Sequence, residues 1–157
     1  MEIRILIAAV AIAAAVLGGV FYGFSSFVMT ALGRISGPEG MRAMQRINID
    51  VFHFSFMALF FGLPIITIGL AVYGWIYLEQ GVAHLLVAGA AVQVLGGFLI
   101  TAFGNVPLNE ALARADADSP EGQALWKRYL RDWTRWNHVR TFMCVATAAV
   151  LLAAVLS

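Results

Sequence analysis

The segment Trp133-Thr-Arg-Trp-Asn-His-Val-Arg140 decides how this chain is organised. A basic amphipathic stretch precedes it, and the last long apolar run of the chain follows it. Amide, imidazole and guanidinium groups at the edge of a hydrocarbon layer are costly unless they are paired or have a function. We therefore expect the rest of the chain to hold this segment against other polar groups.

The composition is that of a membrane protein. Of 157 residues, 61% are hydrophobic and only 12% are charged, whereas soluble domains carry about 25% charged residues. Backbone groups in lipid must bond within their own segment, so the spans should be helices. The prediction is an all-α fold, a four-transmembrane-helix bundle forming one integral membrane domain over residues 1–157. The expected spans are about 5–32, 51–78, 82–104 and 139–157.

The distribution of lysine and arginine predicts the orientation. The first apolar run is longer than the 7–15 residues of a signal-peptide core, so we expect a retained span. Three basic residues lie between the first two spans, six lie between the last two, and only Arg4 lies on the opposite side. Because positive loops stay inside, the connections 33–50 and 105–140 should be cytoplasmic, with both termini on the outer side.

The two connections resemble each other, since each carries a Ser, Pro and Glu cluster followed by a helix that ends in Asn. This predicts cytoplasmic amphipathic helix extensions and two parallel hairpins related by a pseudo-two-fold axis. Asn48 would then correspond to Asn137, and Ser25 to Asn105. Chance similarity of two capped loops is the alternative.

The second extension, at about 120–137, has the pattern of a helix lying in the membrane interface. Its apolar side carries four large rings, which we expect at headgroup depth: Trp126, Tyr129, Trp133 and Trp136.

Amide side chains collect where the spans reach the predicted cytoplasmic side. Each amide needs hydrogen-bond partners if it is buried. Helix capping and ligand binding are both open for these residues, which are Gln45, Asn48, Asn105, Asn109 and Asn137.

His138 is the best acid–base candidate because imidazole titrates near neutrality. Arg140 is the candidate for binding an oxyanion or a carboxylate; the alternative is that it snorkels to the interface or pairs with an aspartate. His53 follows Asp50 by three residues, which is typical of a proton relay or a haem-ligand site. A polar stripe against the neighbouring helix is the alternative for His53.

Several partners are not indicated. A net charge of +1 without a long basic block gives no reason to expect nucleic acid. The histidines lack the short spacing of metal ligands, and the single cysteine, Cys144, cannot form an internal disulfide. The predicted partners are the lipid bilayer and a small apolar molecule.

Three motifs carry a resemblance to a known family: Met44-Gln-Arg-Ile-Asn48, Asn105-Val-Pro-Leu-Asn109 and Trp133 to Arg140. Together they resemble the anthrone oxygenase-like family of small four-helix integral membrane proteins, nearly from end to end. Bacterial members largely form a domain of unknown function. The resemblance implies that this chain lies in a bacterial inner membrane. Fungal members look like catalysts that turn anthrones into anthraquinones with molecular oxygen.

The resemblance implies an oxygenase of anthrone-like phenolic aromatics that needs no cofactor. His138 would remove the methylene proton. The enolate oxygen would be stabilised by Asn48, Asn105, Asn137 and Arg140. The substrate would lie against the two indoles and the amides: Trp133, Trp136, Gln45, Asn48, Asn105 and Asn109.

Two other classes of function stay open at this point. One is a module that binds haem b or a quinone through His53 and His138, such as an accessory subunit of a membrane complex. The other is a structural or partner-binding protein, including a homo-oligomer.

Overall fold

The computed structural model describes residues 2–157, and over that range the chain is helical with no strand. The first rod comprises α1 (Glu2–Gly23), the π-helical turn η1 (Phe24–Val28) and α2 (Met29–Arg34). The second rod comprises α3 (Gly37–Asp50) and α4 (Phe54–Tyr77). The third comprises α5 (Gln80–Val92), the π-helical segments η2 (Gln93–Leu99) and η3 (Thr101–Asn105), and α6 (Val106–Arg114). The fourth is α7 (Pro120–Leu156) alone.

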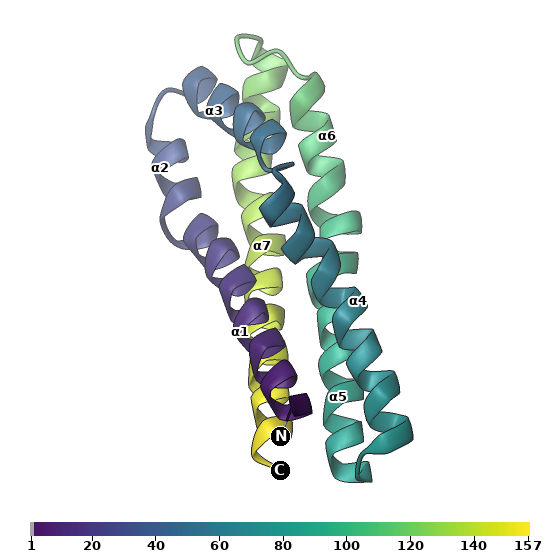
Figure 1. Ribbon diagram of the computed structural model, residues 1–157. Helices are drawn as coiled ribbons and strands as arrows, with labels where there is room; N and C mark the ends of the chain where they lie inside the picture. The colour runs from purple at the N-terminus through teal and green to yellow at the C-terminus, as the bar shows by residue number, and fades with distance from the viewer. Residues whose placement is uncertain (1) are drawn as a thin grey trace.

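The predicted four-span membrane bundle is confirmed. Four stretches of helix are long and apolar enough to cross a membrane: Glu2–Arg34, Phe54–Tyr77, Gln80–Arg114 and Pro120–Leu156. Both ends of the chain lie beside the α4–α5 turn, and we call this the terminal end (Figure 1). The α2–α3 and α6–α7 connections lie at the opposite end, which we call the connection end (Figure 1).

The predicted interfacial helix at 120–137 is not separate from the last span. It forms one helix of 37 residues with that span, about 55 Å long at 1.5 Å per residue. A hydrocarbon layer is about 30 Å thick, so α7 extends well beyond one side of it. Trp126, Tyr129 and Trp133 are buried in the protein, so these rings face neighbouring helices and not lipid, while their position at headgroup depth stays a prediction. Their apolar stripe packs on neighbouring helices instead.

The third span also continues further than expected. Pro107 does not end it, because Val106 is helical and the rod runs to Arg114. A proline inside a helix clashes with the carbonyl four residues earlier. Here the wider π-helical turn η3 immediately precedes it, and such turns relieve misfits in an α-helix. The same turn brings Asn105 into the interior of the bundle.

The two hairpins run in the same direction, as the predicted repeat requires, but their connections differ. α3 ends at Asp50, a turn occupies 51–53, and α4 begins at Phe54. In the second hairpin the equivalent helix passes through Asn137 without a break. Packing between the hairpins exceeds packing within the first hairpin, since α1 lies mainly against α7 and α4 lies mainly against α5.

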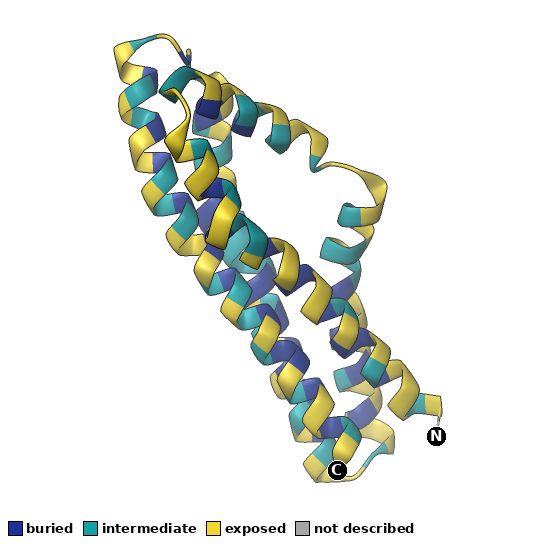
Figure 2. Ribbon diagram, turned by 90° about the vertical axis from the view of Figure 1, so that its left-hand side faces the viewer, coloured by how far each residue is buried: buried dark blue, intermediate teal, exposed yellow. Residues whose placement is uncertain are grey.

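Two apolar clusters form the core. The larger fills the terminal half, where residues such as Leu17, Phe21 and Cys144 are buried. The smaller lies at the connection end around Met29, Tyr129 and other side chains of α3, α6 and α7. Buried residues follow the inward sides of the helices, and exposed ones cover the outside (Figure 2). The two clusters leave a level between them on α1 and α7 that polar residues occupy.

Close packing of the third and fourth rods predicts a cost for adding a methyl group at Gly96. A Cβ there would collide with Cβ and Cγ of Met143, near the backbone rather than at a flexible tip. We expect Gly96→Ala to lower the free energy of unfolding by roughly 1–3 kcal/mol. Gly62→Ala is the control, because nothing lies within 4 Å of a Cβ at that position; its stability should stay level or rise by up to about 1 kcal/mol. Thermal unfolding in detergent checks this, and equal melting temperatures for both variants would contradict the packing.

Candidate functional site

Arg140 is the centre of the polar level between the two apolar clusters. It is only 6% exposed, and its guanidinium lies 4.1 Å from the centre of the Phe21 ring and 5.2 Å from that of Trp133. Aromatic faces attract cations, and the attraction is larger away from water. Within residues 2–157, no carboxylate forms an ion pair with Arg140. The structure therefore holds a buried cation without a counter-anion.

Asn137 fixes the guanidinium from one turn earlier on α7. Its Oδ1 accepts a 2.5 Å hydrogen bond from Nη2 of Arg140. Its Nδ2 donates to the Phe21 carbonyl and to Oγ of Ser25, both at 2.6 Å. The first rod widens into η1 where Ser25 lies. Asn137 thus ties α1 and η1 to the guanidinium, and all of its hydrogen bonds lie within the protein.

The third rod supplies the other side of this level. Thr101, at the start of η3, accepts a 3.2 Å hydrogen bond from Nη1 of Arg140 and donates to the Gly97 carbonyl. Asn105 is fully buried, and its Nδ2 donates to the Trp133 carbonyl at 3.2 Å. We call Ser25, Thr101, Asn105, Asn137 and Arg140 the polar layer.

Some buried polar atoms have no partner in the described part of the chain: Gln93 Oε1, Asn105 Oδ1, Thr134 Oγ1 and Arg140 Nε. Two of them belong to the polar layer. A buried polar group without a hydrogen bond costs about 1–3 kcal/mol. A guanidinium has five N–H donors, and the Arg140 guanidinium donates only two hydrogen bonds to acceptors within residues 2–157. The polar layer therefore has donors left over for an anionic oxygen.

A column of rings separates this layer from the connection end. Trp126, Tyr129 and Trp133 stack along α7 with centroids 5.7 and 5.9 Å apart. Asn109 Oδ1 accepts hydrogen bonds of 2.8 Å from both the Tyr129 hydroxyl and the Trp133 indole. Asn48 donates to the same hydroxyl at 3.4 Å. Asn48 and Asn109 thus hold the rings and lie outside the polar layer.

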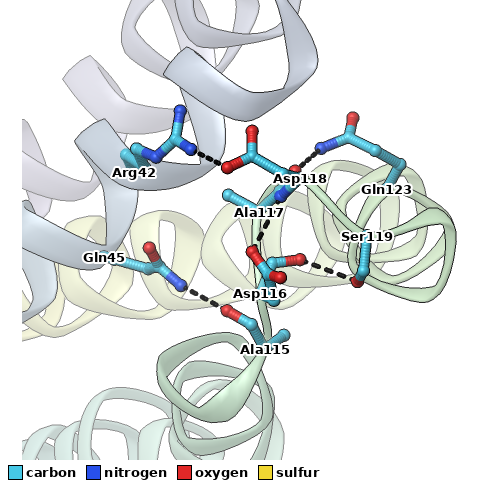
Figure 3. Close-up of polar contacts among 8 residues, drawn as sticks. All are labelled: Arg42, Gln45, Ala115, Asp116, Ala117, Asp118, Ser119 and Gln123. Atoms are coloured by element: carbon cyan, nitrogen blue, oxygen red, sulfur yellow. Dashed lines mark hydrogen bonds and ion pairs between the residues drawn. The ribbon is translucent and has the colours of Figure 1, made fainter.

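Gln45 has a role in joining helices. Its Nε2 donates to the carbonyls of Leu112 and Ala115, at 2.8 and 3.0 Å, where α6 ends. One turn earlier on α3, Arg42 pairs with Asp118 of the α6–α7 connection. Figure 3 shows both side chains reaching this connection from α3. These contacts place Gln45 at the connection end of the bundle, away from the polar layer.

His138 does not join the polar layer. It is exposed, because adjacent residues on a helix point about 100° apart and its neighbour Asn137 points inward. Trp136 is 45% exposed and covers Gly104, where an added Cβ would lie 2.8 Å from the indole. The structure thus brings together Arg140, Asn137, Asn105 and Trp133 of the predicted site, and leaves His138 and Trp136 on the outside.

The predicted Asp50–His53 couple is also absent from the described hydrogen bonds. Asp50 bonds to Arg46 instead, with its Oδ2 accepting from Nε at 2.9 Å, and this bond raises the pKa of the exposed Arg46. His53 lies in the turn before α4, is exposed, and its Nδ1 lies 3.0 Å from Oγ of Ser55. The turn at 51–53 breaks the helical stripe on which the prediction rested.

Among residues 2–157, no three His, Cys, Asp or Glu side chains lie close enough to hold a metal ion. An open groove of about 930 Å³ lies at the terminal end between α1 and α4. It is lined by residues such as Leu6, Ile66 and Tyr73, and it is remote from the polar layer.

The fold and this layer define a class: a four-span helical membrane protein with a buried, uncompensated guanidinium. A family model described as anthrone oxygenase matches residues 52–150, which is more than half of the chain. The chain therefore belongs to the anthrone oxygenase family, and the resemblance found in the motifs is confirmed. The matched stretch includes Thr101, Asn105, Asn137 and Arg140. No curated protein and no solved structure was found to match the chain.

Sequence reasoning did not assign Ser25 and Thr101 of the polar layer, or the Phe21 ring that contacts it, to the site. All three lie in apolar runs in which a single ring or hydroxyl carries no distinctive pattern. A signal existed on α7, however. Buried positions recur there every three or four residues from Trp126 through Asn137 and Arg140 to Leu151, and this spacing excludes His138.

The network around Asn137 predicts a specific loss of stability. Asn137→Ala would leave the Phe21 carbonyl and the guanidinium with one partner fewer, so we expect the free energy of unfolding to fall by roughly 1–3 kcal/mol. Asn48→Ala is the matched control, because its half-buried amide makes one long bond of 3.4 Å; its cost should be well below that of Asn137→Ala. Melting temperatures in detergent compare the two, and an equal or smaller cost at Asn137 would contradict the network.

Proposed function

We propose that this protein oxidises flat, apolar, phenolic aromatics of the anthrone class with molecular oxygen, without a cofactor, and that Arg140 binds the oxygen of the substrate as its enolate. Family membership supports the oxygenase class. The single observation that carries the residue assignment is the burial of Arg140 without a carboxylate partner in residues 2–157.

The substrate would reach this guanidinium from the bilayer, where an apolar tricycle dissolves. Preorganised donors in a dry site stabilise developing negative charge more than donors in water do. Asn137 Oδ1 and Thr101 Oγ1 hold the guanidinium from two sides, so its unused N–H groups need no reorganisation as the charge forms. Phe21 and Trp133 supply aromatic surface next to the same charge.

The proposed reaction balances without another reactant. Loss of one proton converts the anthrone to its enolate, whose charge is shared between the carbonyl oxygen and the former methylene carbon. That carbon gives electrons to oxygen and forms a C–O bond, which yields a hydroperoxide after protonation. The hydroperoxide then loses water to give the second carbonyl. Overall, anthrone and O2 become anthraquinone and H2O.

The polar layer contains no histidine or carboxylate that could remove the methylene proton of the anthrone. Because His138 lies outside the polar layer, we do not assign it the proton transfer at Arg140. The enol tautomer of an anthrone is a phenol, so the enolate can instead form at the membrane surface by loss of the phenolic proton to water, and then bind as an anion. In this scheme Arg140 binds the enolate after it has formed, so no protein side chain has to remove the proton.

Arg140→Gln and Arg140→Lys test the role of Arg140. The purified variants are mixed with anthrone, and oxygen uptake and quinone absorbance are measured. Loss of an oxyanion donor typically costs 10²–10³-fold in turnover, so we expect a drop of roughly that size for Arg140→Gln and a smaller one for Arg140→Lys. Arg128→Gln, exposed on the same helix, should retain turnover.

The same assay tests the alternatives. His138→Ala should keep most of its turnover because its imidazole is off the layer. A folded Arg140→Gln variant with normal turnover would remove the assignment, and a wild-type protein inert towards anthrone would remove the function. A Soret band in the purified protein that disappears in His53→Ala would favour the haem module.

We further propose that the protein lies in a bacterial inner membrane with the connection end in the cytoplasm, as the excess of lysine and arginine at that end favours. In a Cys144→Ala background, Ala113→Cys should be protected from a membrane-impermeant maleimide in spheroplasts, and Gln80→Cys should be labelled. Both positions are exposed. Labelling of Ala113→Cys with protection of Gln80→Cys would reverse the orientation.

A further inference from the structure

A second polar layer lies deeper in the bundle, on the terminal side of Arg140. It consists of Gln93, which begins η2, Thr67 of α4 and Thr147 of α7, and each is 1% exposed or less. Thr and Gln side chains inside membrane spans normally hydrogen-bond to a carbonyl or to a neighbouring helix, so one without such a bond needs another partner. π-helical segments such as η2 are also frequent at functional sites. The oxidation at Arg140 makes no use of these three residues.

The packing of the third and fourth rods places Gln93 and Thr147 at one level. Gly96 lies against the side chain of Met143, and the two helices are antiparallel (Figure 1). Gln93 is three residues before Gly96, and Thr147 is four residues after Met143. The two side chains therefore lie at about the same depth.

Thr67 reaches the same level from α4. A Cβ on Gly74 would lie 2.6 Å from the side chain of Leu86, in the antiparallel pair formed by α4 and α5. Thr67 lies seven residues before Gly74, and Gln93 lies seven residues after Leu86. α4 packs directly against η2, so the three polar residues come from three neighbouring elements.

The hydrogen bonds of this layer leave acceptors unused. The Thr67 hydroxyl donates to the Leu63 carbonyl at 2.9 Å, and the Thr147 hydroxyl donates to the Met143 carbonyl at 2.9 Å. Both hydroxyl protons are thus committed to their own helices. Gln93 Oε1 is buried and has no partner within residues 2–157. An unpaired acceptor at the same level as two hydroxyl oxygens fits a ligand group that donates a hydrogen bond.

The wall between the two layers is made of small and flexible residues. Arg140 and Thr147 are two turns apart on one side of α7, roughly 10 Å along its axis. Gly18, Gly96 and Gly97 are close to this interval, and Met143 covers Gly96. The Met143 side chain can repack beyond its Cγ, while its Cβ and Cγ stay against Gly96. The spacing of the two layers along α7 is comparable with the size of a three-ring aromatic.

We propose that the second polar layer recognises a phenolic hydroxyl on an outer ring of the substrate, with Gln93 Oε1 accepting its hydrogen bond. This inference rests on the proposed function, because Arg140 would hold the central oxygen of the same molecule. A hydroxyl next to the central carbonyl bonds to that carbonyl internally. The layer therefore selects a hydroxyl placed away from it, and Gln93 is a specificity-determining residue.

The test compares the binding of anthraquinone and 2-hydroxyanthraquinone, which are unreactive and differ by one outer hydroxyl, through quenching of tryptophan fluorescence. One hydrogen bond to a buried acceptor is worth roughly tenfold in affinity, so the wild type should prefer the hydroxylated quinone by about that factor. Gln93→Met, which keeps the length of the side chain and removes its polar atoms, should abolish the preference. Gln80→Met, the same change at an exposed position of the same rod, should keep the preference.

The melting temperature without ligand separates recognition from a structural role. Removing an unpaired buried acceptor relieves its desolvation cost, so Gln93→Met should melt at or above the wild-type temperature. A lower melting temperature would assign the amide to bonds within the protein and overturn the inference. Should Gln93→Met not fold, Gln93→Asn shortens the amide by one methylene and should weaken the preference; an unchanged preference there overturns the inference.

The two proposals fail in different ways in this experiment. If the wild type binds both quinones equally, the role of Gln93 is wrong while Arg140 and the oxidation stand. If the wild type binds neither quinone and is inert towards anthrone, the proposed function itself is wrong.

Discussion

The structure depends on how one positive charge is kept inside a bundle that is otherwise apolar. Removing a guanidinium from water costs several kcal/mol, and a carboxylate partner usually offsets part of that cost. For Arg140 the described residues supply only neutral groups: an amide oxygen, a hydroxyl and two aromatic faces. Neutral partners orient a cation without cancelling its charge. An anion that arrives later can therefore still gain the full attraction.

The fold serves this arrangement through its two apolar clusters. The cluster of the terminal half closes the layer on one side, and the ring column at the connection end closes it on the other. The π-helical turns η1 and η3 occur at this level on the first and third rods, where they turn Ser25 and Asn105 inward. Glycines let the rods approach closely enough for Asn137 to reach the Phe21 carbonyl on α1. Placement of the polar groups thus follows from backbone irregularities held by tight packing.

The spans were predictable because a membrane imposes length and hydropathy on any helix that crosses it. The meeting of Asn137 with Arg140 was expected only from the family resemblance. The continuity of α7 was not predicted, because the aromatic and basic pattern before Trp136 also suits an interfacial helix. The spacing of buried positions continues unchanged across that point, and this distinguishes the two structures. Asn48, Asn109 and Gln45 are amides of the same kind as Asn105. Only tertiary packing decides which amide enters the polar layer and which ties helices together.

The unpaired atoms separate a structural from a functional interpretation of the buried polar groups. A network selected only for stability would satisfy its members, since each orphaned atom lowers stability by an amount comparable with a single destabilising mutation. Here the orphaned groups have complementary character: a donor on Arg140 and acceptors on Asn105 and Gln93. Gln93 lies at a different depth from Arg140 and Asn105, so the three cannot all satisfy one another. The proposed ligand, with an anionic oxygen and a hydroxyl elsewhere, would supply the missing partners for Arg140 and Gln93, and this chemical fit supports the proposal more strongly than burial alone does.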